Sequence, residues 1–266
     1  MAHEPPFAPT GIIVNGLMAR NGLPGHELQT YLYNLAAHAF VAFGGYLLFG
    51  GLALFGGGRA EAPQLADRSD GAFERRHWIT LAVIAALILS VLLAQVHVGM
   101  GAFFGAVILV LSGAADDGEA IRQMPWRVIV MVCGVTVLVA LVERTQGIDL
   151  LVSLVARVAS SNTVTAVVAF LTGIVSVYSS TSGVVLPAFL PMVPGLTAQL
   201  PGASAVAIAS SMNIGGHLVD VSPLSTIGAL CLAGTTGDES RSLFIKLLAW
   251  GLSMSVVSAL LCYVMF

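Results

Sequence analysis

The amino-acid sequence predicts an all-α polytopic membrane protein, and three observations support this fold class. Hydrophobic residues make up 57% of the chain and charged residues only 9%, whereas about a quarter of a typical soluble domain is charged. Apolar segments of membrane-spanning length recur along the chain. Two polar clusters interrupt the most apolar region, and irregular backbone inside a bilayer is normally buried in protein or lines a hydrated cavity.

Composition and motifs exclude several function classes. The net charge of −3 is spread through the loops without a basic run, so no nucleic-acid partner is expected. Cys133, Cys231 and Cys262 lie singly in apolar segments, which predicts buried small side chains and no metal or redox site. Neither G-x-S-x-G nor H-E-x-x-H occurs, so the sequence predicts neither an enzyme nor a cofactor.

The N-terminal part of the chain predicts half a helix followed by one full span. Residues 11–19 are strongly apolar, yet a crossing helix needs roughly 20 residues. Residues 31–55 are long enough to span once. Asn34 and His38 lie one turn apart on this span, which favours interior packing or hydrogen bonding, with proton handling as the alternative. Residues 56–77 form a polar linker.

Four further spans are predicted outside the polar clusters. Residues 78–95 and 99–114 are separated by a short uncharged segment, which predicts an antiparallel helical hairpin. Residues 125–142 make another span, and residues 243–265 make the last one. Between these two, residues 148–158 predict an amphipathic helix with charged residues on its flanks.

Residues 163–194 predict a re-entrant hairpin. An apolar run over 164–177 is too short to cross comfortably, and a cluster of hydroxyls follows at 179–183. The chain then continues as a proline-interrupted apolar arm. We therefore expect one short helix to enter the bilayer, the polar cluster to form the tip, and the second arm to return.

Residues 203–235 predict a discontinuous helix. Two apolar half-lengths, 203–214 and 224–235, are separated by GGHLVDVSP. Ser222 is placed as the N-cap of the second half and Pro223 as its first helical residue. A broken helix of this kind is typical of transporter sites near the bilayer midplane.

The positive charges predict an orientation. With the loop 56–77 on the cytoplasmic side, eight of the eleven Lys and Arg residues lie on that side, in agreement with the positive-inside rule. The hairpin then enters from outside, and the C-terminus lies outside.

The two ends of the chain suggest an inverted repeat. Residues 6–13, PFAPTGII, align without a gap with residues 223–230, PLSTIGAL. Transporters with inverted repeats place a broken helix at corresponding points of each half. We therefore interpret 1–57 as a remnant of a first repeat, 58–77 as a cytoplasmic linker and 78–266 as a complete second repeat.

Four stretches carry a family resemblance: 6–17, 124–151, 177–196 and 218–233. There the chain resembles the malonate-type dicarboxylate carriers, which are related to the divalent-anion:sodium symporters of the ion-transporter superfamily. The resemblance implies a re-entrant hairpin and a broken helix in each repeat, whose tips bind a cation and the substrate carboxylates. It also implies cation-coupled transport of C3 or C4 dicarboxylates such as malonate or succinate, by an elevator movement.

The resemblance places substrate and ion binding at the hairpin tip and the helix break. The family's Ser-Asn-Thr motif falls on Ser179, Ser180 and Thr181, and the serine at 180 weakens a sodium site because an amide carbonyl ligates cations better than a hydroxyl. A candidate Na⁺ position lies near Ser179, Thr181 and Asp220, with no firm metal site. The full candidate set is Ser179, Ser180, Thr181, Ser182, Gly183, Asn213, Gly215, Gly216, Asp220, Ser222, Pro223, Ser225 and Thr226.

Electrostatics supports such a site independently. No Lys or Arg occurs between Arg157 and Asp220. A dicarboxylate that loses its water of hydration here must therefore be stabilised by hydroxyls and helix N-termini. Asp220 would repel the dianion unless it is protonated or paired with a cation, which would couple transport to Na⁺ or H⁺. The alternatives for Asp220 are a helix cap or a surface position, and His217 is expected to hydrogen-bond with it.

Alternatives and partners follow from the same features. Small hydroxyl residues also pack membrane helices closely, so a non-transporting scaffold, a partner subunit or an inactive truncated carrier is the alternative function. Because the chain resembles an N-terminally incomplete carrier, we expect that it does not transport alone and that a second polypeptide supplies the missing repeat. A small dicarboxylate, the lipid bilayer and a second copy in a homodimer are the other expected partners, in a bacterial inner membrane.

Overall fold

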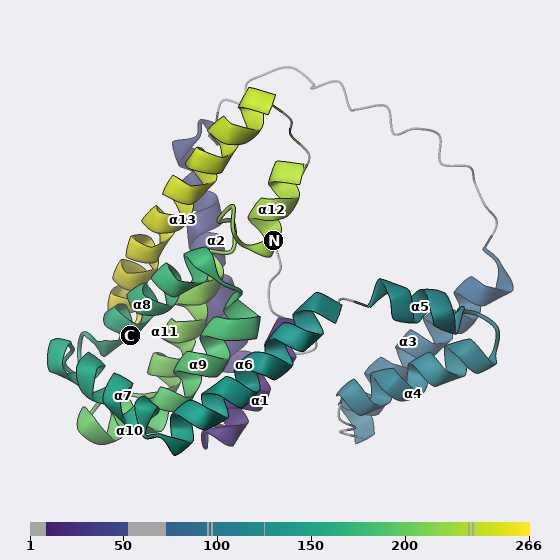
Figure 1. The fold of residues 1–266 in the computed structure, drawn as a ribbon, viewed down its shortest axis with the longest axis horizontal. Helices are drawn as coiled ribbons and strands as arrows, with labels where there is room; N and C mark the ends of the chain where they lie inside the picture. The colour runs from purple at the N-terminus through teal and green to yellow at the C-terminus, as the bar shows by residue number, and fades with distance from the viewer. Residues whose placement is uncertain are drawn as a thin grey trace. The chain divides into compact units, whose positions relative to one another are not determined.

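The computed structural model describes residues 9–52, 73–94, 96, 98–124, 126–233, 235 and 237–266, and the regular elements among them are all helical (Figure 1). They form two compact units, residues 1–55 with 127–266 and residues 56–126. Residues 6–8 of the proposed repeat and residues 58–72 of the linker lie outside the described residues.

The smaller unit contains the predicted helical hairpin. Its helices are α3 (Arg75–Ala94), α4 (Val98–Leu111) and α5 (Asp117–Gln123), and α3 packs against α4. Helix α5 begins where the Asp116 carboxylate accepts a hydrogen bond of 2.7 Å from the main-chain N–H of Glu119, a standard N-cap.

The larger unit carries every predicted site residue, and its helices of eight or more residues overlap the predicted ranges, although α2 ends at Leu48, before the predicted end at residue 55. They are α1 (Pro9–Arg20), α2 (Glu27–Leu48), α6 (from Trp126 to Arg144), α7 (Gly147–Val158), α8 (Val164–Tyr178), α11 (Ala205–Leu218), α12 (Thr226–Ala233) and α13 (Gly237–Met265). Helices α8, α11 and α13 pack against one another (Figure 1), and α2 packs on α11.

The main hydrophobic core joins α1, at the N-terminal end of this unit, to α8 and α11. Val14 of α1, Val168 of α8 and Met212 of α11 are each almost completely buried within it. Val152 and Val155 add the buried side of α7. Residues far apart along the chain therefore hold α8 and α11 together, and these are the two helices that lead to the polar clusters.

The returning arm of the hairpin is helical but changes type at its prolines. A π-helical turn at Thr181–Val185 precedes α9 (Leu186–Phe189), a 3₁₀ turn at Leu190–Met192 and α10 (Val193–Gln199). Prolines at 187, 191 and 194 lack the N–H that a regular α-helical ladder needs. The arm therefore stays nearly continuous while its hydrogen-bond pattern shifts.

Two described helices are long and apolar enough to cross a bilayer, Thr181–Gln199 and Glu239–Met265. The apolar helices Gly99–Leu111 and Val164–Tyr178 are shorter. The remaining predicted spans, the re-entrant entry of the hairpin and the inverted repeat stay predictions.

Candidate functional site

The polar tip of the hairpin lies against the break between α11 and α12. We define the hairpin tip as residues 179–183 and the helix break as residues 219–225. The contact between them has a physical origin, since α8, which leads into the hairpin tip, packs along α11, which leads into the helix break. The two polar clusters of the sequence thus form one region.

Thr181 provides the central contact of this region. Its hydroxyl donates to Oδ1 of Asp220 at 2.7 Å and lies 3.1 Å from the carbonyl oxygen of Gly216. It is also hydrogen-bonded to the hydroxyl of Ser176. A hydroxyl has one hydrogen, and the carboxylate is the stronger acceptor. Ser176 therefore donates to Thr181, which donates to Asp220. Thr181 and Ser176 are buried.

Two glycines of α11 permit this close approach. A Cβ built on Gly216 would collide with Cγ2 of Thr181. A Cβ on Gly215 would collide with the carbonyl oxygen of Ala169 and would lie 2.5 Å from Oγ1 of Thr172, both on α8. These two glycines therefore allow α11 to approach α8 and the hairpin tip closely.

The second half of the broken helix begins later than predicted. Helix α12 starts at Thr226, so the assignment of Ser222 as N-cap and Pro223 as first helical residue is wrong. The Ser222 hydroxyl instead donates to the carbonyl oxygen of Val177 at 2.8 Å, and the N–H of Ser225 closes a turn on the carbonyl oxygen of Ser222 at 3.0 Å. The long-range bond to α8 holds this segment in a turn.

Several hydroxyls of the candidate set bind main-chain atoms nearby. The Ser225 hydroxyl lies within hydrogen-bond distance of the carbonyl oxygens of Asp220 and Ser222 and donates its one hydrogen to either of them. Ser179 donates to the carbonyl oxygen of Val175 at 2.8 Å. The Ser180 hydroxyl accepts the N–H of Gly183 at 3.2 Å, which starts the returning arm.

The other candidate residues are placed less directly. Ser182 lies half-buried in the π-helical turn and Pro223 is buried in the helix break. Asn213 is buried on α11, one turn before His217. The side chain of Thr226 lies outside the described residues.

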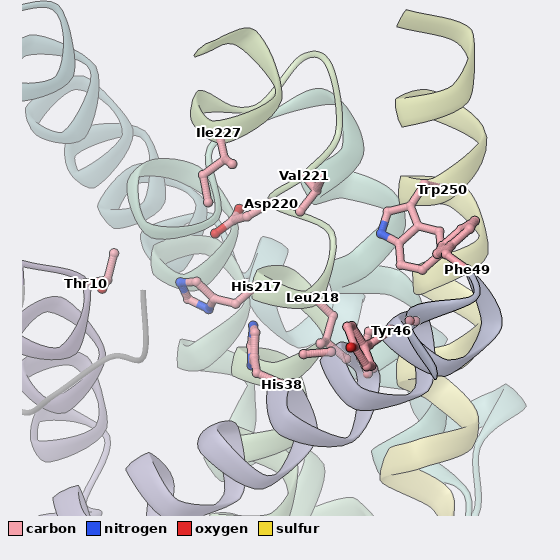
Figure 2. Close-up of a pocket in the computed structure, with 14 residues that line it drawn as sticks. Thr10, His38, Tyr46, Phe49, His217, Leu218, Asp220, Val221, Ile227 and Trp250 are labelled. Atoms are coloured by element: carbon pink, nitrogen blue, oxygen red, sulfur yellow. The ribbon is translucent and has the colours of Figure 1, made fainter. Parts of the chain in front are cut away.

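A cavity of about 470 Å³ opens beside Asp220. Figure 2 shows Asp220, His217 and His38 at this cavity, with Tyr46 and Trp250 also on its wall. The wall comes from α1, α2, α11, α12, α13 and the helix break. Its volume falls within the range of about 300–1,000 Å³ that is usual for small-molecule sites.

The sequence-based site did not include the two histidines of this cavity. His38 and His217 each follow an asparagine by four residues, in NLAAH and NIGGH. The ring Nδ1 of His38 lies 2.8 Å from the carbonyl oxygen of Asn34, and that of His217 lies 2.9 Å from the carbonyl oxygen of Asn213. The repeated N-x-x-x-H spacing was the available signal, but only the fold shows that both histidines line one cavity.

Comparison with known proteins identifies the family. The model of the citrate transporter family (CitMHS) matches residues 5–197 and 84–266, which together span almost the whole chain. No curated protein and no solved structure matches the chain. The match agrees with the resemblance to carriers of the divalent-anion:sodium symporter type, while the narrower malonate specificity and the coupling ion stay proposals. The chain is therefore an integral membrane protein that belongs to the citrate transporter family.

Proposed function

We propose that this protein is part or all of a secondary carrier for small di- and tricarboxylates. Citrate-type anions are the class that its family suggests, and C3 or C4 dicarboxylates such as malonate and succinate are the narrower proposal. One observation carries it: the hairpin tip meets the helix break through Thr181 and Asp220, beside a cavity of about 470 Å³.

Charge favours coupling to a cation. Asp220 lines the cavity, and an ionised carboxylate there repels an anionic substrate. A cation or a proton at Asp220 removes this repulsion, so substrate and cation stabilise each other's binding. We propose Na⁺ or H⁺ as the coupling ion, with an elevator movement of the hairpin and the broken helix as the transport step.

The hydrogen bonds at the hairpin tip and the helix break limit which protein groups can donate a hydrogen bond to a substrate carboxylate. The hydroxyl hydrogens of Thr181, Ser222 and Ser225 are donated to protein acceptors. Without rearrangement they cannot also be donated to a carboxylate, because each hydroxyl has one hydrogen. Most main-chain N–H groups of the helix break are donated within the protein as well, so the first N–H groups of the returning arm are the better candidates for substrate contact.

These same bonds favour a second candidate function. Ser222 and Thr181 tie the helix break to α8 and the hairpin tip, as expected of a purely structural interface between membrane helices. On this alternative the protein is a membrane scaffold or partner subunit without a substrate of its own.

Binding and uptake separate the two candidates. The full chain is reconstituted in lipid vesicles, and uptake of labelled citrate, malonate and succinate is followed with an imposed Na⁺ or pH gradient. Calorimetric titration of the same protein in nanodiscs detects binding in the absence of turnover. Saturable binding of at least one carboxylate supports the carrier. Absence of saturable binding of all three, by a folded protein, contradicts the carrier and favours the scaffold, whereas binding without uptake agrees with a chain that needs a second polypeptide to transport.

A further inference from the structure

We propose that the hairpin of α3 and α4 carries a binding site for an anionic phospholipid. One acyl chain of the lipid lies in the groove between the two helices, and its phosphate lies at Arg75 and Arg76, where α3 begins. The site belongs to the smaller unit, and it is independent of the proposed carrier function.

An apolar groove of about 690 Å³ follows the seam between α3 and α4, which pack side by side (Figure 1). Ser90 has the one polar side chain among the described residues that line it, and its hydroxyl donates to the carbonyl oxygen of Leu87 at 2.8 Å. The groove therefore suits a hydrocarbon chain and not a polar ligand. Its apolar walls include Ile79, Val83 and Leu87 from α3 and Met100, Phe104 and Ile108 from α4.

Two glycines of α4 explain why the groove is open. A Cβ built on Gly101 would lie 2.7 Å from Cδ1 of Leu87, and one on Gly105 would lie 3.0 Å from Cγ1 of Val83. The backbone of α4 therefore approaches α3 closely. The large side chains of Met100 and Phe104, beside the glycines, stay 70% and 68% exposed, so they border the groove without filling it.

The groove has the length of one leaflet of a bilayer. From Ile79 to Ser90, α3 rises about 16 Å at 1.5 Å per residue. The hydrocarbon core of a bilayer is about 30 Å thick, so one leaflet contributes about 15 Å. An extended acyl chain of a phospholipid in that leaflet therefore matches the groove from end to end.

Two arginines continue the same face of α3 beyond the groove. Arg75 and Arg76 lie one turn before Ile79, and residues three and four apart on a helix are neighbours on its surface. Both arginines are exposed. They lie in the first turn of α3, which contains no acidic residue, and positive charge there opposes the helix dipole. A phosphate at this end offsets both the arginine charges and the dipole.

The nearby carboxylates do not neutralise this charge. Glu74 lies 2.8 Å from Nε of Arg76, but this pair is exposed and weak, and the other N–H groups of the guanidinium remain for a phosphate. The side chain of Arg75 forms no ion pair in the described part of the chain. Three carboxylates that follow α4 accept hydrogen bonds within their own segment, those of Asp116, Asp117 and Glu119.

Aromatic residues place this end of α3 at the membrane surface. Phe73 and Trp78 are 67% and 63% exposed, and their ring centroids lie 5.7 Å apart. Tryptophan is enriched at the level of the lipid headgroups. The segment 56–77 is predicted to be cytoplasmic, and anionic lipids give the cytoplasmic leaflet its negative surface potential. The arginines therefore select an anionic phospholipid over a zwitterionic one.

The test of the headgroup contact uses the full chain in nanodiscs. These contain equal amounts of phosphatidylglycerol and phosphatidylcholine with identical acyl chains, and native mass spectrometry counts each lipid that the released protein retains. The variant Arg75→Gln/Arg76→Gln removes the proposed phosphate ligands. The matched control Arg144→Gln/Arg157→Gln removes the same charge from exposed positions of the larger unit.

The wild type is expected to retain more phosphatidylglycerol than phosphatidylcholine. This preference should fall by about fivefold for each arginine removed from α3, and it should be unchanged in the control. Equal losses in the two double variants would show a general effect of charge and overturn the site. A wild type without preference for phosphatidylglycerol overturns it with no variant needed.

A second pair of variants tests the groove. Ala86→Phe fills it, because Ala86 is on its wall, whereas Ala85→Phe adds the same ring to an exposed position of α3 outside the wall. Ala86→Phe should retain less of both lipids, and Ala85→Phe should behave as the wild type. Equal retention by the two variants, with thermal unfolding showing both to be folded, overturns the groove as the acyl-chain site. A lipid-free dimer that Ala86→Phe converts to monomer would assign the groove to a second copy and overturn the proposal.

Discussion

The hydroxyl of Thr181 donates to Oδ1 of Asp220 across 2.7 Å, although the two residues are 39 positions apart. This bond joins the hairpin tip to the helix break between a buried hydroxyl and a half-buried carboxylate, and a hydrogen bond to a charged group is worth about 1.5–3 kcal/mol. The other side of Asp220 faces the cavity. One carboxylate therefore links the packing of the hairpin to the proposed binding region.

Replacing Thr181 by valine tests the contribution of this bond. Valine keeps the shape but removes the donor, which leaves the carboxylate of Asp220 without this partner. We expect the protein to lose about 1–3 kcal/mol of stability, or about 2–4 °C in Tm for each kcal/mol. Thermal unfolding in nanodiscs measures the loss. Thr181→Ser, which keeps the hydroxyl, should lose less, and equal losses would contradict the role of the bond.

The contact between Gly216 and Thr181 predicts a rescue. Gly216→Ala places a Cβ against Cγ2 of Thr181, so the single variant should be destabilised by about 1–3 kcal/mol through overpacking. Thr181→Ser removes that Cγ2 and keeps the hydroxyl. The double variant should therefore unfold at a higher temperature than Gly216→Ala alone, with a coupling energy of about 0.5–3 kcal/mol. If the free-energy changes of the two single variants simply add in the double variant, the Cβ at position 216 and the side chain at position 181 are not in contact.

Ser222 should matter more for stability than Ser179. Its hydroxyl bonds Val177 across 45 positions of sequence at 2.8 Å, whereas Ser179 bonds Val175 within its own helix end. Removing the buried long-range donor leaves a carbonyl oxygen without that partner, so Ser222→Ala should cost about 1 kcal/mol or more. Ser179→Ala is the matched control and should cost less. The comparison is made by thermal unfolding, and the reverse order would show that Ser222 does not anchor the turn.

Asp220→Asn separates charge from shape. The amide oxygen of asparagine can still accept from Thr181, so folding should be retained within about 1 kcal/mol. The charge is lost, and uptake of carboxylate should no longer respond to an imposed cation or proton gradient. Uptake with and without the gradient measures this. Asp149→Asn on the exposed surface of α7 is the control, and a gradient response retained in Asp220→Asn would exclude Asp220 as the coupling group.

The sequence predicted most of the helices and the polar region, for identifiable reasons. Apolar runs such as 164–177 and 243–265 match α8 and α13 closely, since hydrophobic periodicity and length reflect local chemistry. The prediction that Pro223 is the first residue of a helix was wrong because proline fits a turn as well as the first turn of a helix. The hydrogen bond from Ser222 to Val177 favours the turn, and this long-range bond cannot be predicted from the local sequence.

By itself, the sequence determined that this protein is apolar and helical, that polar clusters interrupt its helices at 179–183 and 219–225, and that it resembles an anion carrier. These properties depend on composition and local spacing, which are visible along the chain. Only the tertiary structure decided that Thr181 meets Asp220 and that His38 and His217 line one cavity. Those pairs are brought together by the packing of α2 and α8 on α11, and such long-range contacts leave no local pattern in the sequence from which to predict them.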